Sequence, residues 1–287
     1  MSLTGPAGQR RPATRIAVTS GKGGVGKTSL SINLAVAMSR LGHRVGIIDA
    51  DFALGNVDVM LGLTPEEHLG AVLEGTKTVS DVALNGPSGV RVIPAGSGVR
   101  ALTALDEPRW SRLVTAVRDT SRDLDFLLFD TASGVSDNVL DVVNLADYVL
   151  VVTSYDPAAV VDAYAVIKLI NANDHVKPIG VVVNSTRDAD EAGLVFRQIS
   201  LAADRFLGRS LRYDGHVLED RSIKDSGLAQ RPLIGHESSG PASRCIRRLA
   251  CRLIAARPSG VGPWSPSPPP LTPGPSGPAG REASQCA

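Results

Sequence analysis

The octapeptide GKGGVGKT, at residues 21–28, constrains this chain more than any other stretch. A short β-branched stretch (16–20) precedes it, and a helix-like stretch that ends at Gly42 follows it. A glycine-rich turn between a strand and a helix lets backbone N–H groups and the helix N-terminus converge on a phosphate. The sequence therefore predicts a phosphate-binding loop in a strand–loop–helix unit.

Within this loop, one lysine and one hydroxyl residue are expected to meet the phosphates most directly. We expect Lys27 to reach the β- and γ-phosphates of a nucleotide, and the Thr28 hydroxyl to ligate the Mg²⁺ that bridges them. The glycines allow the backbone to curl tightly around the phosphates. The expected nucleotide-binding residues of the loop are Gly21, Lys22, Gly23, Gly24, Val25, Gly26, Lys27, Thr28 and Ser29.

The rest of the chain alternates short apolar stretches with helix-like stretches. Fully apolar strands separated by helices indicate an α/β fold, with a mostly parallel sheet that helices cover on both faces. The weaker pattern of 208–234 predicts a short strand, a turn and a short helix. We expect further strands at 45–51, 90–96, 125–130, 148–154 and 178–184, and helices at 108–121, 136–145, 157–171, 189–207 and 241–257.

Four polar residues fall at or just past the carboxyl ends of these expected strands, namely Asp49, Asp51, Asp130 and Asn184. Ligands of parallel sheets bind at this edge. Mg²⁺ and an attacking water both need carboxylates beside a phosphate loop, so the sequence predicts a nucleotide and metal site there. Helix capping by Asp49 or Asp51 and turn formation by Asn184 are the alternatives.

Lys22 is not required by the general phosphate-loop pattern, and a solvent-facing lysine is one explanation of it. In the setting KGGVGKT, however, the loop resembles the deviant Walker A loop of the MinD/ParA ATPases. The resemblance implies a phosphate-loop NTPase fold that binds ATP and Mg²⁺. It also implies that Lys22 reaches across an ATP-bound homodimer to the partner's nucleotide and assists hydrolysis together with Lys27 and Asp51.

The same resemblance implies a role for each polar strand-end residue. Asp49 would contact the water shell of the metal, Asp51 would orient the hydrolytic water, and Asn184 would read the adenine. Asp130 would be the Walker B aspartate and belong to the metal site with Thr28 and Asp49. Ser133 departs from the family pattern, which usually has alanine at this position.

Three longer stretches, 49–62, 130–170 and 213–234, are similar to the flagellar-number branch of this family, the FlhG (FleN or YlxH) proteins. The resemblance implies an ATP-dependent dimerisation switch that regulates flagellar placement or number. A signal-recognition-type GTPase (FlhF-like) and flagellar regulators are the implied partners. The N-terminal stretch lacks the Asp-Gln-Ala-type motif of many members, and a proline-rich tail replaces their terminal membrane helix.

Composition limits the classes of protein to which this chain can belong. The formal net charge of +1 indicates no polyanionic partner, although a ParA-type DNA or cargo partitioning ATPase is the main rival in another class. The three cysteines form no C-x-x-C pair, which disfavours an iron–sulfur carrier. No apolar run reaches the roughly 18 residues of a membrane span. We expect a cytoplasmic protein, with peripheral membrane association left open.

We expect three regions along the chain: a flexible lead-in (1–14), one ATPase domain (15–257) and a disordered tail rich in proline, glycine and serine (258–287). The expected helix at 241–257 has an apolar stripe and an arginine-rich side. This helix could dock on anionic lipid. It lacks large aromatic anchors, so packing against the sheet as the last core helix is the favoured alternative.

Overall fold

The computed structural model describes residues 12–96, 106–235 and 239–257. Nearly all of the expected lead-in and the whole of the expected tail therefore lie outside the described residues. The first strand, β1 (Thr14–Ser20), begins one residue before the expected boundary of the ATPase domain, and Thr14 is only 3% exposed.

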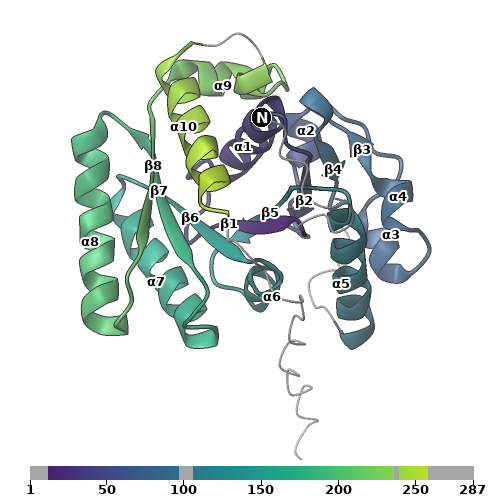
Figure 1. The fold of residues 1–287 in the computed structure, drawn as a ribbon, viewed down its shortest axis with the longest axis horizontal. Helices are drawn as coiled ribbons and strands as arrows, with labels where there is room; N and C mark the ends of the chain where they lie inside the picture. The colour runs from purple at the N-terminus through teal and green to yellow at the C-terminus, as the bar shows by residue number, and fades with distance from the viewer. Residues whose placement is uncertain (1–11, 97–105, 236–238, 258–287) are drawn as a thin grey trace, which may run out of the picture.

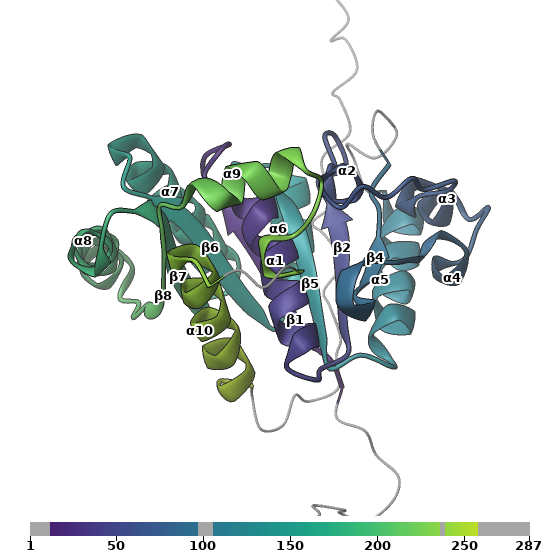
Figure 2. The ribbon, with the colours of Figure 1, turned by 90° about the horizontal axis from the view of Figure 1, so that it is seen from above.

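Within these residues the sheet has eight strands, in the order β3-β4-β2-β5-β1-β6-β7-β8. Figure 2 shows the strands in this order from β8 at one edge toward β4 at the other. All pairings are parallel except that of β3 with β4, which confirms the predicted mostly parallel sheet. The other strands are β2 (Val45–Ala50), β3 (Leu84–Asn85), β4 (Arg91–Ile93), β5 (Phe126–Ser133), β6 (Tyr148–Ser154), β7 (Ile179–Thr186) and β8 (Arg212–Leu218).

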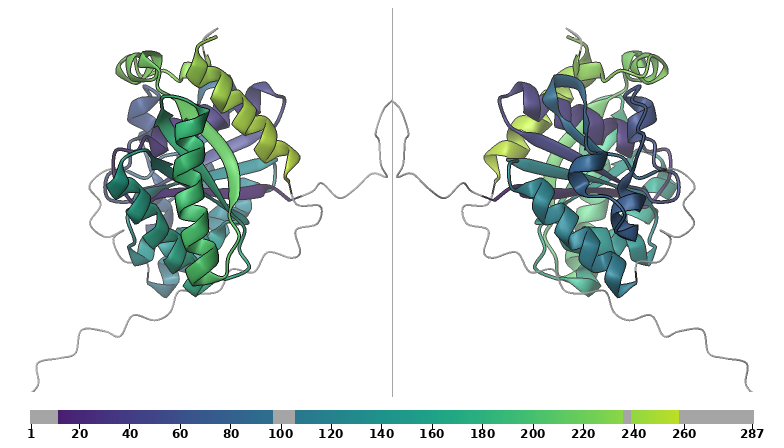
Figure 3. Two further views of the ribbon diagram at one scale, coloured as in Figure 1. Left: turned by 90° about the vertical axis from the view of Figure 1, so that its left-hand side faces the viewer. Right: turned by 90° about the vertical axis from the view of Figure 1, so that its right-hand side faces the viewer.

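Helices cover both faces of the sheet, as predicted (Figure 1). One face carries α1 (Lys27–Arg40) and α10 (Pro241–Ala255), and the short helices α2 (Val57–Met60) and α9 (Arg221–Leu228) lie near them. The other face carries α5 (Glu107–Ser121), α6 (Asp137–Leu145), α7 (Pro157–Asn173) and α8 (Ala189–Leu207). Figure 3 shows α8 beside the β7–β8 edge, and α3 (Leu69–Glu74) and α4 (Val79–Val82) beside α5 at the opposite edge.

Alternation of side chains along β1 explains why this strand lies in the middle of the sheet. Ile16 and Val18 point into the cluster formed with α1 and α10, whereas Ala17 points into the cluster formed with α5 to α8. Each of the three is at most 2% exposed. A strand that buries both faces must have helices on both sides, which the continuous apolar sequence predicted.

The structure also differs from the sequence-based expectation. Asp130 does not end its strand, because β5 continues to Ser133. Asn184 likewise lies two residues before the end of β7. The expected strand at 90–96 is reduced to β4, and the sequence did not predict the edge strand β3 or the short helices α2, α3 and α4. Elements of two to six residues carry too few side chains to show a period.

The apolar stripe of α10 is buried in the protein. Ile246, Leu249 and Leu253 are 1–4% exposed and belong to the cluster that packs α10 against α1 and β8. The core-packing alternative is therefore the one that the structure supports, and this stripe is not free to enter a lipid surface. None of the helices in the described part of the chain combines the length and the apolar character needed to cross a membrane.

Candidate functional site

The glycine-rich loop connects β1 to α1 at the carboxyl edge of the sheet. Gly24 and Gly26 have φ angles of +80° and +85°, in the left-handed region that favours glycine. Gly26 is the N-cap of α1 and makes no side-chain cap hydrogen bond to this helix. The free N–H groups of the α1 N-terminus are therefore available to bind an anion.

Close packing holds both ends of the loop in place. A Cβ atom on Gly21 would lie 2.2 Å from the backbone oxygen of Asp162 in α7, and one on Gly26 would lie 2.3 Å from Nδ2 of Asn184. Asn184 is 7% exposed, and its Nδ2 donates a hydrogen bond to the Val25 carbonyl oxygen over 2.7 Å. The sequence did not predict this brace, and adenine reading by Asn184 stays a prediction.

Asp130 is the centre of the polar network beneath the loop. Its Oδ1 accepts hydrogen bonds from Lys27 Nζ at 3.1 Å and Ser31 Oγ at 2.8 Å, and its Oδ2 accepts one from Thr28 Oγ1 at 2.6 Å. Asp130 is 1% exposed. The structure thus brings Asp130 together with the loop residues, as the sequence predicted. Ser31 was missed, although it lies one helical turn after Lys27 and so shares its face of α1.

Asp49 lies beside Asp130 on the neighbouring strand and is also 1% exposed. Its Oδ1 accepts a hydrogen bond from Asp51 N at 3.1 Å, and its Oδ2 accepts one from Val57 N at 3.0 Å. Burial, reinforced by the negative charge of Asp130, raises the pKa of Asp49 to about 7. A cation at this site would favour the ionised form of Asp49.

Asp51 lies immediately after β2 and is half-buried. Its Oδ1 accepts a hydrogen bond from Leu54 N at 3.0 Å, and this bond holds the turn that follows the strand. The described contacts do not join Asp51 to the phosphate loop. Its expected role in orienting water is therefore a prediction that depends on the nucleotide-bound state.

Lys22 points in a different direction from Lys27. Its Nζ makes an ion pair with Asp156, which is the N-cap of α7, and the side chains are 39% and 48% exposed. The Lys22 carbonyl oxygen accepts a hydrogen bond from Ser20 Oγ at 3.1 Å. The Lys22 ion pair and, after it, the Ala158 N–H group lower the pKa of Asp156.

Comparison with known proteins gives the family of this chain. A sequence model of the ParA family, described as "NUBPL iron-transfer P-loop NTPase", matches residues 12–193. The antiactivator FleN of Pseudomonas aeruginosa is 40% identical over 243 residues, which cover 85% of this chain and 87% of FleN. The chain belongs to the ParA/MinD family of P-loop ATPases. The flagellum site-determining protein YlxH of Helicobacter pylori is 29% identical over 220 residues, which cover 76% of this chain and 74% of YlxH.

The fold of this ATPase is also that of solved family members. The septum site-determining protein MinD of Pyrococcus horikoshii, complexed with Mg-ADP, superposes with a TM-score of 0.72 at 19% identity, covering 84% of this chain and 96% of MinD. The description of the family model includes iron transfer. The three cysteines of this chain form no C-x-x-C pair that could hold iron.

The donor set of this ATPase fits Mg²⁺. No group of three or more His, Cys, Asp or Glu side chains forms a metal cage in the described ranges. Mg²⁺ does not require one, because it binds one or two carboxylates together with substrate phosphates and water. Thr28, Asp49 and Asp130 supply one hydroxyl and two carboxylates, and the two carboxylates are buried register partners on β2 and β5.

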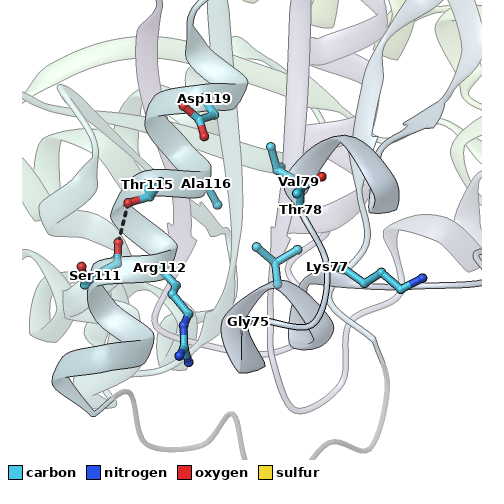
Figure 4. Close-up of a pocket in the computed structure, with 10 residues that line it drawn as sticks. Gly75, Lys77, Thr78, Val79, Ser111, Arg112, Thr115, Ala116 and Asp119 are labelled. Atoms are coloured by element: carbon cyan, nitrogen blue, oxygen red, sulfur yellow. Dashed lines mark hydrogen bonds between the residues drawn. The ribbon is translucent and has the colours of Figure 1, made fainter.

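A groove of about 260 Å³ lies away from this site, between α3, α4 and α5 (Figure 4). Two of its cationic side chains already have partners within the protein. Arg112 donates to the Leu73 carbonyl oxygen at 2.8 Å, and Lys77 points out of the groove toward Glu67, 3.0 Å away. These two cations are therefore engaged by the protein's own groups.

Proposed function

We propose that this ATPase is an ATP-dependent dimerisation switch that hydrolyses ATP with Mg²⁺ and regulates flagellar number or placement. The divergence of the two loop lysines carries this proposal. Lys27 is buried on Asp130, whereas Lys22 lies outside that network at the exposed lip of the loop. A lysine that does not join the phosphate-loop network of its own subunit is available for the nucleotide of a second subunit.

The residues of the nucleotide and metal site would each have a separate role in ATP hydrolysis. Lys27 and the α1 N-terminus would bind the β- and γ-phosphates, and Thr28, Asp49 and Asp130 would hold Mg²⁺. Bound Mg²⁺ would neutralise charge that develops on the phosphate oxygens. Asp51 would orient the attacking water and accept its proton. Lys22 of the partner subunit would add a further positive charge.

Exposed apolar side chains near the phosphate loop support a dimer that forms through the carboxyl edge of the sheet. Leu54 follows β2, Val135 follows β5, and Leu228 lies on α9 at the same edge of the sheet. They are 76%, 49% and 77% exposed. Large apolar side chains beside a binding site are typical of a surface that a partner covers. A second copy of this chain would cover them when ATP is bound.

The flagellar part of the proposal rests on the relatives. FleN is named an antiactivator, and YlxH is named a flagellum site-determining protein. By likeness to that branch, we propose an FlhF-like GTPase and flagellar regulators as partners of the ATP-bound dimer. Peripheral attachment to the inner face of the cell membrane would have to use surfaces other than the buried stripe of α10.

The decisive experiment is size-exclusion chromatography with light scattering, using full-length protein with Mg²⁺ and either ADP or a slowly hydrolysed ATP analogue. We expect a monomer with ADP and a dimer with the analogue. A monomer in both conditions contradicts the switch. Repeating both arms with liposomes that contain anionic lipid tests membrane attachment, for which co-sedimentation with the analogue alone is the expected result.

One observation favours the ParA-type alternative. The α10 helix contains no acidic residue, and its outer face exposes Arg244, Arg248 and Arg252. Such a face can bind a nucleic-acid backbone, and that binding weakens steeply with salt. A duplex shift assay with ATP at 50 and 200 mM salt separates the two functions. A salt-sensitive, ATP-dependent shift supports partitioning, and its absence supports the flagellar switch.

A further inference from the structure

The ion pair between Lys22 and Asp156 connects the phosphate loop to a helix on the opposite side of the loop from Asp130. Asp156 precedes Pro157 at the start of α7, and its Oδ1 accepts a hydrogen bond from Ala158 N at 2.8 Å. This leaves the other carboxylate oxygen for Lys22 Nζ. Asp156 therefore both caps α7 and binds the lysine that distinguishes this loop.

Both members of the pair are held in position by their surroundings. Gly21 packs against the α7 backbone so closely that no side chain fits there. Ser20 Oγ hydrogen-bonds to the Lys22 carbonyl oxygen, and Gly134 N, just after β5, donates to the Ser20 carbonyl oxygen at 2.8 Å. The backbone of Lys22 is thus tied to the ends of β1 and β5. Its side chain meets a carboxylate fixed by a helix N-terminus.

We propose that Asp156 is a latch that keeps Lys22 within its own subunit until a nucleotide of the partner subunit competes for it. The latch rests on the proposed dimerisation switch and adds a control on when it operates. In this proposal, Lys22 Nζ leaves Asp156 when it binds phosphates across a dimer interface. The pair must therefore open before the dimer closes.

The charges decide the direction of this exchange. A triphosphate has several negative charges and Asp156 has one, so the phosphates of the partner can displace the carboxylate. The pair is also partly exposed, and such pairs contribute little to stability. The latch therefore raises the concentration of ATP-bound protein needed for dimerisation without preventing dimerisation.

Asp156→Asn isolates the latch from the helix cap. Asparagine caps helices about as well as aspartate, so α7 keeps its N-cap while Lys22 loses its ionic partner. Asp188→Asn is the matched control, because Asp188 caps α8 in the same way, with Glu191 N donating at 2.8 Å. Asp156→Glu keeps the negative charge and is the conservative variant. Thermal melts establish that all variants are folded.

The measurement is the protein concentration at which half the chains are dimeric, with saturating Mg²⁺ and ATP analogue. Loss of one exposed pair is expected to favour opening by about two- to fivefold per subunit, and therefore the dimer by roughly 4- to 25-fold. The expected result is tighter dimerisation of Asp156→Asn, with Asp188→Asn like wild type and Asp156→Glu close to it. The difference in dimerisation between Asp156→Asn and wild type should be smaller at 300 mM salt than at 50 mM salt, because screening weakens the exposed Lys22–Asp156 pair in wild type.

Two outcomes overturn the latch. A folded Asp156→Asn variant that dimerises like wild type shows that the pair does not restrain Lys22. A folded variant that dimerises more weakly shows instead that Asp156 positions Lys22 for the dimer. If wild type and all variants stay monomeric with the analogue, the dimerisation switch itself fails, which distinguishes that failure from failure of the latch alone.

Discussion

Asp49 and Asp130 are direct register partners on the neighbouring strands β2 and β5, and each is 1% exposed. Asp130 is neutralised by Lys27 and receives two hydroxyl hydrogen bonds, whereas Asp49 receives only backbone N–H groups. Among the described contacts, Lys27 thus pairs with Asp130 and not with Asp49. Burial, and after it the negative charge of Asp130, raises the pKa of Asp49 to about 7.

Mg²⁺ affinity should depend on pH through Asp49. The metal favours the ionised carboxylate, so below pH 7 its binding must release a proton from Asp49. We expect the Asp49-dependent part of Mg²⁺ affinity, in the presence of ADP, to be about tenfold weaker at pH 6 than at pH 8. Titration of Mg²⁺ by calorimetry at the two pH values measures this. Asp49→Asn is the control, because it retains only the pH dependence of the nucleotide; equal pH dependence in both proteins contradicts the prediction.

Lys22→Gln should separate nucleotide binding from dimerisation. Lys27 and the α1 N-terminus are unchanged, so the affinity for an ATP analogue should stay within about threefold of wild type. ATP turnover should fall at least about a hundredfold, because a cation supplied in trans to a transferring phosphate is worth that much or more. Dimerisation with the analogue should be lost. Lys168→Gln, which changes an exposed lysine on α7, should behave like wild type. Normal dimerisation and hydrolysis by Lys22→Gln would show that the loop lysine has no role across an interface.

Asp51→Ala should block hydrolysis while sparing ATP binding. Loss of a group that orients water and accepts its proton costs roughly 10²- to 10⁴-fold in rate. The ATP-bound dimer should therefore persist with ATP itself, which light scattering during an ATP chase can follow. Asp58→Ala, on the nearby helix α2, is the control and should reset like wild type. A wild-type rate in Asp51→Ala means that another group positions the water.

Asp141, on α6 and 7% exposed, gives a prediction for stability. Burial first, and then the charge of Asp137, raises its pKa to about 6. An unfolded aspartate ionises near pH 4, so stability from this group falls as the pH rises from about 4 to 6 and stays lost above that range. Asp141→Asn should therefore increase the free energy of unfolding by about 1–3 kcal/mol at pH 7.5 and leave it nearly unchanged at pH 4. Urea denaturation at both pH values tests this, with the exposed Asp204→Asn as control; an equal effect at both pH values would contradict it.

Local patterns in the sequence predicted most of the fold. Continuous apolar strands such as β6 and a long helix such as α8 were placed with the bounds that the structure has. The edge strand β3 and the short helices were missed, because they depend on neighbours and not on their own periodicity. Asp156 was missed as a site residue, although an aspartate before Pro157 is a recognisable start of a helix. That signal predicts a cap and does not identify the residue that the cap binds.

The sequence by itself determined the phosphate loop, the parallel α/β class and the polar residues near the carboxyl ends of the strands, because each depends on residues adjacent in the chain. Only the tertiary structure decided which of these residues meet. Placing β1 between β5 and β6 brings Asp130 under Lys27 and Asp156 beside Lys22. Folding also buries the apolar stripe of α10, which packs in the hydrophobic core. These contacts join residues more than 100 positions apart, and only the order of strands in the sheet brings them together.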